Sequence, residues 1–353
     1  MTATAQTQQT VRIAINGYGR IGRSVLRAIH ESSFRNQIQV VAINEPADID
    51  TIVHLTKYDS IYGRFPGEVI ADHKNSQIIV DGQGIALIST VDISDLPWRE
   101  HQVDVVLDCS GKYTTSEELN QHLQQGAGKV LLSQPGENDL KAIVYGINHE
   151  QINSEDVICS AASCTSNCIV PVIDVLHSAF TIESGIITTI HSAMNDQPVI
   201  DAYHHTDLRK TRAAGQSIIP VDTGLADGIG RILPALEGKF SARALRVPTL
   251  TVSLMELGVT TRKKATAAEV NDCLRQAATT RLSSILDFTD EPLASCDFNH
   301  DPRSGIIDTG QTRVNGQQVN VLAWFDNEWA YANRMIDIVM YWTQLKNPAA
   351  ARI

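Results

Sequence analysis

The chain has 353 residues, of which 43% are hydrophobic and 20% charged, the composition of an ordinary folded protein of about two domains. Its 29 Lys and Arg stand against 40 Asp and Glu, and the formal net charge of −11 argues against a general binder of nucleic acid or of anionic membranes. No apolar run approaches the ~18 residues of a membrane-spanning helix, so we do not expect the chain to enter a membrane.

Residues 1–10 are polar, lack basic side chains and have no apolar centre, which is typical of a terminal tail and not of a signal peptide. Six cysteines are scattered through the chain without a secretory signal. This pattern favours reduced thiols in a cytoplasmic protein over a disulfide framework.

The first part of the chain alternates short apolar runs with amphipathic stretches. Strands are predicted at 11–15, 40–43, 103–107 and 129–132, and helical spacing of apolar residues predicts a helix at 21–29. This alternation indicates an α/β domain with a doubly wound parallel sheet of the Rossmann type.

The pattern changes at residue 164, where the strands become longer and the helices fewer. Helices are predicted around 169–176, 267–278 and 328–345, and strands at 186–190, 244–247, 249–257 and 319–324. Longer strands with few helices indicate an α+β domain with a largely antiparallel sheet. We therefore predict a dinucleotide-binding domain at 1–163, completed by the C-terminal segment 327–353, and a catalytic domain at 164–326.

A glycine motif follows the first predicted strand. Gly17, Gly19 and Gly22 match G-x-G-x-x-G, and the motif opens a helix, which is the context that a dinucleotide-binding turn requires. The three glycines allow a tight turn, close approach of the pyrophosphate and close helix packing, respectively. Glu45 follows the second strand, where a carboxylate accepts hydrogen bonds from the ribose and repels a 2′-phosphate. The motif predicts NAD, in preference to NADP.

One cysteine and one histidine suggest a nucleophile. Cys164 opens a predicted helix between Ser163 and Thr165, and His191 ends the next apolar strand. A helix N-terminus and a neighbouring imidazolium both favour a thiolate. The alternative for Cys164 is a small buried apolar residue, and spacing alone leaves this open. The cysteines at 159, 164 and 168 match no paired zinc-binding pattern, so no metal is expected.

Several motifs resemble the phosphorylating glyceraldehyde-3-phosphate dehydrogenase family. They are Gly-Tyr-Gly-Arg-Ile-Gly-Arg at 17–23, Ala-Ser-Cys-Thr-Ser-Asn-Cys at 162–168, Arg-Val-Pro-Thr at 246–249 and Asp-Asn-Glu-Trp at 326–329. Within that family, the segments 189–197, 199–203, 217–223 and 297–302 look most like the erythrose-4-phosphate dehydrogenase branch.

The resemblance implies a role for each matching residue. Cys164 would attack the aldehyde to give a thiohemiacetal and then a thioester, and His191 would act as acid or base. The implied cofactor contacts are Arg20 and Ile21 at the pyrophosphate, Ser133 at the nicotinamide ribose and Asn327 at the carboxamide. The implied substrate contacts are Ser163, Thr165, Thr223, Gly224 and Arg246, with Arg209 or Arg212 adding charge. A homotetramer, with 193–217 at a subunit interface, and a place in pyridoxine biosynthesis are implied likewise.

Two residues depart from the family pattern. Met194 stands where a threonine is usual, and Ala161 stands where an asparagine is usual. The missing hydroxyl predicts a poorer phosphate site and a thioester that water resolves, so the product would be 4-phosphoerythronate. Two alternatives stay open, namely a phosphorylating glyceraldehyde-3-phosphate dehydrogenase and a catalytically silent NAD-binding regulator or scaffold.

Overall fold

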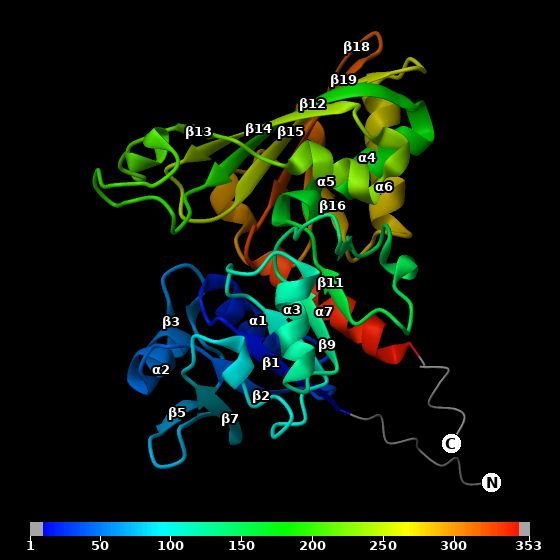
Figure 1. Cartoon of the computed structure of the whole chain (residues 1–353). Helices are drawn as coiled ribbons and strands as arrows, with labels where there is room; N and C mark the ends of the chain where they lie inside the picture. Colours follow the sequence, from blue (N-terminus) through cyan, green and yellow to red (C-terminus); the bar gives the residue numbers. More distant parts are fainter. Residues whose placement is uncertain (1–9, 346–353) are drawn as a thin grey trace, which may run out of the picture. The chain divides into compact units, whose positions relative to one another are not determined.

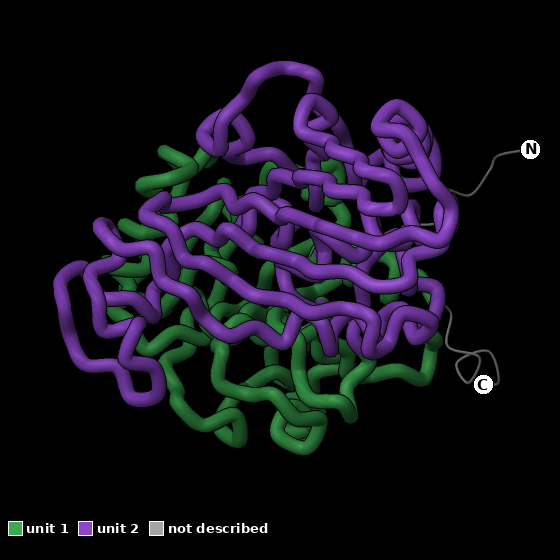
Figure 2. Tube along the Cα trace, turned by 90° about the horizontal axis from the view of Figure 1, so that it is seen from above, with its two compact units in different colours: residues 1–141, 152–161, 335–353 green, residues 142–151, 162–334 purple. Residues whose placement is uncertain are grey.

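The computed structural model describes residues 10–345, which form two compact units (Figure 2). Within the described part of the chain, the first unit comprises residues 10–141, 152–161 and 335–345, and the second comprises 142–151 and 162–334. The tail expected at 1–10 lies outside the described residues except for Thr10.

The first unit is built on a nine-stranded sheet with the strand order β10-β11-β9-β8-β1-β2-β7-β6-β5. The strands are β1 (Val11–Asn16), β2 (Ile38–Asn44), β5 (Val69–Asp72), β6 (Gln77–Val80), β7 (Gln83–Ile88), β8 (Val105–Asp108), β9 (Lys129–Leu132), β10 (Lys141–Ala142) and β11 (Ile158–Ser160). Pairing is parallel from β11 to β7, and β5 and β6 pair antiparallel at one edge. The four predicted strands of this half are confirmed, whereas the hairpins of β5 to β7 were not predicted.

Helices connect the parallel strands of this unit (Figure 1). They are α1 (Arg20–Glu31), α2 (Ile49–Lys57) and α3 (Ser116–Gln124). Thr115 and Glu118 form a capping box that fixes where α3 begins. The C-terminal helix α7 (Trp329–Gln344) ends in this unit, where Trp342 Nε1 donates to Asp156 O at 3.2 Å. A small separate hairpin joins β3 (Tyr58–Asp59) to β4 (Gly63–Arg64).

The second unit holds an eight-stranded, mostly antiparallel sheet with the order β13-β14-β12-β15-β19-β17-β16, and β18 pairs with β19. The strands are β12 (Ile182–Ser192), β13 (Ile219–Val221), β14 (Phe240–Val247), β15 (Ser253–Thr261), β16 (Leu286–Thr289), β17 (Gly305–Asp308), β18 (Arg313–Asn315) and β19 (Gln318–Phe325). Only the pairs β12–β14 and β16–β17 are parallel among them. The two-domain α/β fold class that the sequence predicts is confirmed.

Three helices pack on one face of this second sheet (Figure 1). They are α4 (Cys164–Phe180), α5 (Leu225–Ile232) and α6 (Ala267–Thr279), and their apolar side chains form one core with the inward side chains of β12, β15 and β19. The strand predicted at 249–257 is wrong at its start. Val252 has φ +61°, a left-handed conformation that interrupts extended backbone, so β15 begins at Ser253.

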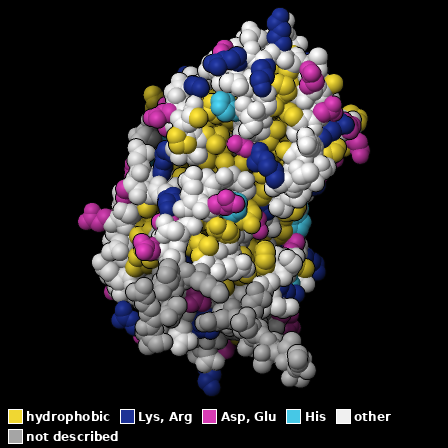
Figure 3. Space-filling view, turned by 90° about the vertical axis from the view of Figure 1, so that its right-hand side faces the viewer, with side chains coloured by type: hydrophobic (Ala, Val, Ile, Leu, Met, Phe, Trp, Pro, Cys, Tyr) yellow, Lys and Arg dark blue, Asp and Glu magenta, His cyan; other side chains and the backbone are white. Residues whose placement is uncertain are grey.

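No helix within residues 10–345 has the length and apolarity needed to cross a membrane. On the face that Figure 3 shows, Lys and Arg side chains are interspersed with Asp and Glu, and hydrophobic side chains lie between them.

Candidate active site

The glycine loop of the first unit lies between β1 and α1. Gly17 has φ +89°, and a Cβ on it would lie 2.6 Å from the Ser110 backbone. A Cβ on Gly22 would lie 2.3 Å from Gly17 O, so α1 packs against the loop with no room for a side chain. A Cβ on Gly19 would meet nothing within 4 Å. Two glycines are therefore needed for packing, and the third faces open space.

Glu45 follows β2 and turns back to the same loop. Its Oε2 accepts a hydrogen bond from Tyr18 N at 2.9 Å. Arg20, the first residue of α1, is ion-paired with Asp59 and lies over the Tyr62 ring at 5.6 Å. Ser133 begins the turn after β9, where its backbone N donates to Asp108 O at 2.9 Å. The predicted cofactor residues of this unit therefore gather at the carboxyl ends of β1, β2 and β9, the edge at which open parallel sheets bind ligands.

In the second unit, α4 begins at Cys164, as the sequence predicts. Ser163 is the N-cap, and its Oγ accepts from Ser166 N at 2.9 Å and lies 2.8 Å from Thr165 Oγ1. The polar residues on either side of the cysteine thus fix the helix start. The partly exposed Cys164 side chain stands at the positive end of a seventeen-residue helix.

Cys164 and His191 form a pair. The Cys164 Sγ lies 3.8 Å from His191 Nε2. Burial raises the pKa of the thiol to about 11, which Arg246 only partly offsets. Burial, and secondly the Arg246 cation, lower the pKa of the imidazole to about 4. Burial therefore opposes both the thiolate and the imidazolium that the sequence favours, because each charged form loses water on burial.

Arg246 contacts the far side of the imidazole. Its Nη1 lies 2.8 Å from His191 Nδ1, which also lies 2.8 Å from Ser192 O. Nδ1 can donate to Ser192 O only when it carries the single N–H proton of the neutral ring, and it can accept from Arg246 only when it lacks that proton. It therefore cannot bond to both partners at once. When Nδ1–H donates to Ser192 O, the Nε2 lone pair faces the thiol and can act as a base. When Arg246 donates to Nδ1, Nε2–H faces the sulfur and can donate a hydrogen bond to it.

Asn327 lies beside this pair within the same unit, and two serines hold its side chain. Ser192 Oγ and Ser253 Oγ donate to Asn327 Oδ1 at 3.0 and 3.1 Å, and Ser192 N donates to Ser253 Oγ at 3.1 Å. Both serines are at most 1% exposed. Neither serine is among the residues predicted from the sequence, where only the adjacency of Ser192 to His191 points to one of them. The two serines fix which way the amide faces.

Thr223 and Gly224 precede α5, whose N-cap is Gly224. Thr223 Oγ1 accepts from Leu225 N at 3.3 Å. One turn further on, a Cβ on Gly228 would lie 3.5 Å from Ser166 Oγ, so the first turns of α4 and α5 are close together. The N-termini of α4 and α5 and the Arg246 cation therefore lie in the same region of the second unit, and this arrangement favours the binding of an anion.

The two remaining candidate arginines lie in the long exposed loop after β12. Arg212 Nε pairs with Asp201 Oδ2 at 3.1 Å. Arg209 lines a hollow of about 500 Å³ that also includes Asp222, the neighbour of Thr223. Met194 is 44% exposed at the start of this loop. Arg209 therefore shares a hollow with Asp222, whereas Arg212 is not among the residues that line it.

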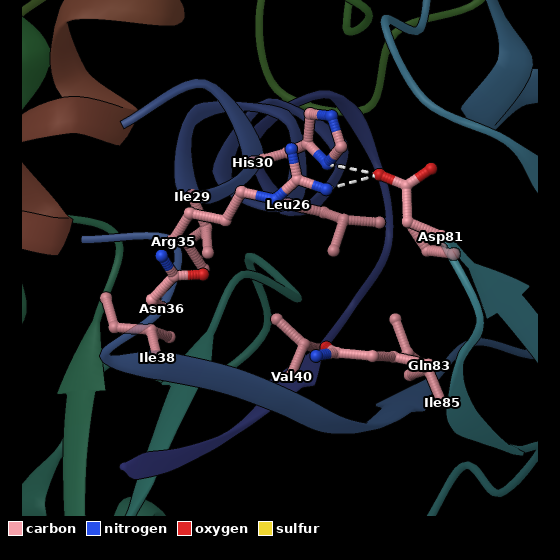
Figure 4. Close-up of a pocket in the computed structure, with 11 residues that line it drawn as sticks. Leu26, Ile29, His30, Arg35, Asn36, Ile38, Val40, Asp81, Gln83 and Ile85 are labelled. Atoms are coloured by element: carbon pink, nitrogen blue, oxygen red, sulfur yellow. Dashed lines mark hydrogen bonds and ion pairs between the residues drawn. The ribbon is translucent and has the colours of Figure 1, made fainter. Parts of the chain in front are cut away.

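Another hollow, of about 160 Å³, lies in the first unit (Figure 4). Apolar side chains from α1 and from the start of β2 line it, and His30 and Arg35 both point to Asp81, at 3.4 and 2.5 Å. It lies at the amino end of β2, whereas Glu45 follows the carboxyl end, and it holds none of the predicted site residues. Within residues 10–345, no cluster of three or more His, Cys, Asp or Glu side chains could hold a metal ion.

Comparison with protein-family models matches both parts of the chain. Residues 11–116 match the NAD-binding domain of glyceraldehyde 3-phosphate dehydrogenase, and residues 163–327 match its C-terminal domain. The first match contains the glycine loop and Glu45, and the second contains Cys164, His191 and Arg246. The predicted cofactor, NAD, is that of the matched domain. The chain belongs to the glyceraldehyde-3-phosphate dehydrogenase family of NAD-dependent oxidoreductases.

Proposed function

We propose that this protein oxidises D-erythrose 4-phosphate to 4-phosphoerythronate with NAD, through a cysteine thioester that water hydrolyses. Cys164 is the nucleophile, His191 the acid and base, and Arg246 the cation for the anionic substrate. The proposal is supported by the 3.8 Å approach of Cys164 Sγ to His191 Nε2 and by the half-buried Arg246 on the far side of the imidazole.

The first step needs a base next to a neutral thiol. A sugar phosphate that attracts Arg246 would release His191 Nδ1 to donate to Ser192 O, which turns the Nε2 lone pair towards the sulfur. His191 then takes the thiol proton as Cys164 Sγ bonds to the aldehyde carbon. Substrate binding and formation of the base are thereby coupled through one guanidinium.

The next steps balance without another oxidant. His191 would pass the proton taken from the thiol to the aldehyde oxygen, giving the thiohemiacetal. NAD, when bound, would supply the acceptor for the hydride of that carbon, while His191 takes the hydroxyl proton and releases it to solvent, and the carbonyl of a thioester forms. Water then adds to that carbonyl, the carbon–sulfur bond breaks, and the thiol is restored. His191 can take a proton from the water and return one to the sulfur. The resemblance assigns Asn327 to the carboxamide, and the bonds from Ser192 and Ser253 to its Oδ1 leave its Nδ2 as the donor.

The proposal that water is the acyl acceptor rests on Met194. Its side chain has no hydroxyl to donate to inorganic phosphate, and its backbone N donates to Gln197 Oε1 at 3.0 Å within the same turn. A phosphate ion would therefore find one donor fewer than a threonine at this position provides. The runner-up function keeps the thioester but uses glyceraldehyde 3-phosphate and phosphate.

One experiment tests this choice. NADH formation is measured with erythrose 4-phosphate and with glyceraldehyde 3-phosphate, each with and without phosphate, for wild type and Cys164→Ala. We expect phosphate-independent turnover of the tetrose and none in the variant. Turnover of the triose that requires phosphate would establish the runner-up. No turnover of either sugar would favour the silent NAD-binding scaffold, although such a protein has no need of the Cys164–His191–Arg246 arrangement.

We also propose that the chain assembles as a homotetramer through the loop after β12. Large apolar side chains in this loop are almost fully exposed, with Val199 at 89%, Tyr203 at 103% and Leu208 at 84%. Exposed apolar side chains concentrated in one segment mark an interaction site. Sedimentation of the wild type against a Tyr203→Asp, Leu208→Asp variant tests this, and a wild-type monomer would contradict it.

A further inference from the structure

Five buried polar side chains form a continuous chain of hydrogen bonds in the first unit. Asn16, Asn44 and Asp108 are the last residues of β1, β2 and β8, and His122 and Trp98 extend the chain behind them. Trp98, Asp108 and His122 are 0% exposed, Asn16 is 4% exposed and Asn44 7%. Buried polar networks of this kind are stable only when every member has partners. None of the cofactor, substrate or catalytic contacts described above involves the side chains of this network.

The register of the parallel sheet brings the three strand ends together. Asn16 pairs in register with Asn44 on one side and with Asp108 on the other. Asn16 Nδ2 donates to Asp108 Oδ2 at 2.8 Å, and Asn44 Nδ2 donates to Asn16 Oδ1 at 2.8 Å. A line of side-chain bonds thus crosses the carboxyl edge of the sheet, directly below the glycine loop.

The proton positions in this chain follow from the donors. The Trp98 indole N–H can only donate, and it reaches His122 Nδ1 at 2.9 Å, so Nδ1 carries no proton. His122 Nε2, 3.1 Å from Asp108 Oδ2, therefore carries the proton and donates it. Ser110 N and Ser110 Oγ donate to Asp108 Oδ1 at 3.1 and 2.7 Å. Asp108 is a buried carboxylate that four neutral donors satisfy.

Asp108 also fixes the surface on which Gly17 rests. The Ser110 turn that the carboxylate holds is the backbone that a Cβ on Gly17 would meet at 2.6 Å. Cys109 N donates to Asn16 O at 2.7 Å, and Gly17 N donates to Asn44 O at 2.9 Å. A shift of the carboxylate would therefore move the turn, the end of β1 and the glycine loop together.

We propose that Asp108, held by His122 and Trp98, is a positioning residue for the dinucleotide, because it sets the place of the loop that receives the pyrophosphate. The proposal rests on NAD binding by the first unit and not on the identity of the aldehyde. A binding measurement can therefore contradict the role of Asp108 without contradicting the proposed oxidation, and an activity assay can contradict the oxidation without contradicting the role of Asp108.

The test measures the Kd of NAD and of ADP-ribose for the full chain, together with the Tm. Asp108→Asn places an amide N–H₂ against donors, and His122→Leu leaves the Trp98 donor and one carboxylate position unpaired. For each variant we expect roughly tenfold weaker binding of both ligands, the loss typical of one charge-assisted hydrogen bond. The Kd should rise equally for both ligands because both contain the pyrophosphate.

The conservative variant and the control separate positioning from stability. His122→Gln can accept from Trp98 through Oε1 and donate to Asp108 through Nε2, so we expect its Kd within about threefold of wild type. Asp104 Oδ2 accepts from Arg12 N at 2.8 Å at the opposite end of β1, and Asp104→Asn should leave the Kd unchanged.

Three results would overturn the proposal. The first is a lowered Tm with wild-type Kd in Asp108→Asn and His122→Leu, which is the result of a purely structural role. The second is weaker NAD binding with unchanged ADP-ribose binding. The third is failure of His122→Gln to restore the Kd that His122→Leu loses. If Asp108→Asn does not fold, Ser110→Ala removes only one donor and should weaken both ligands about threefold, and wild-type binding by that variant would equally overturn the proposal.

Discussion

Alanine at two glycines of the same loop should weaken NAD binding in both cases but lower the stability in only one. In Gly22→Ala, the new Cβ would lie 2.3 Å from Gly17 O and 3.1 Å from Ile15 Cγ2, whereas ordinary contact begins at 3.4 Å. Helix α1 must then move by roughly 1 Å, and overpacking of this kind costs about 1–3 kcal/mol. At about 2–4 °C per kcal/mol, the Tm should fall by several degrees, and NAD should bind more weakly.

Gly19→Ala supplies the matched comparison. Its Cβ would meet nothing within 4 Å, and its φ of −71° suits alanine, so the Tm should stay within about 1–2 °C of wild type. The same methyl group would stand where the pyrophosphate approaches the backbone, so the Kd for NAD should rise at least about tenfold. Calorimetric melting and titration with NAD check both variants. Wild-type NAD binding by Gly19→Ala, or a wild-type Tm for Gly22→Ala, would refute this reading of the loop.

Three further predictions concern the second unit. Because the pKa of buried His191 is lowered to about 4, the unfolded chain gains a proton below pH 6.5 that the folded chain does not. The free energy of unfolding should therefore fall by about 1.4 kcal/mol per pH unit from this group as the pH falls from 6.5 to 4. Urea unfolding of His191→Asn should show a smaller loss of stability over the same pH range. Arg246→Met removes the cation that lowers the pKa of Cys164, so alkylation of Cys164 at pH 8 should slow while exposed Cys296 reacts as before, as mass spectrometry of the labelled peptides can show. Met194→Thr places a hydroxyl in the loop after β12, and NADH formation should become more dependent on phosphate. An unchanged response to phosphate would show that Met194 does not decide between water and phosphate as the acyl acceptor.

Local chemistry in the sequence determined much of the framework. The glycine motif predicted the β1–α1 turn, and Ser163 and Thr165 predicted that α4 begins at Cys164, because both signals act within one turn of the backbone. A further local signal was overlooked. Asp81-Gly82, with φ values of +46° and +79°, is a two-residue hairpin turn that joins β6 to β7.

Tertiary structure decided what depends on residues far apart in the chain. The Asp108 network joins strand ends 28 and 92 residues apart, and only the parallel register brings them side by side. The electrostatic surroundings of the Cys164–His191 pair depend on the tertiary structure in the same way. The sequence places a thiol at a helix start and a histidine at a strand end, but it does not contain their burial or the contact of Arg246, 55 residues from His191. Desolvation is a property of the packed unit, so the sequence could name the two reacting groups, whereas only the packed structure shows the burial that opposes their charged forms.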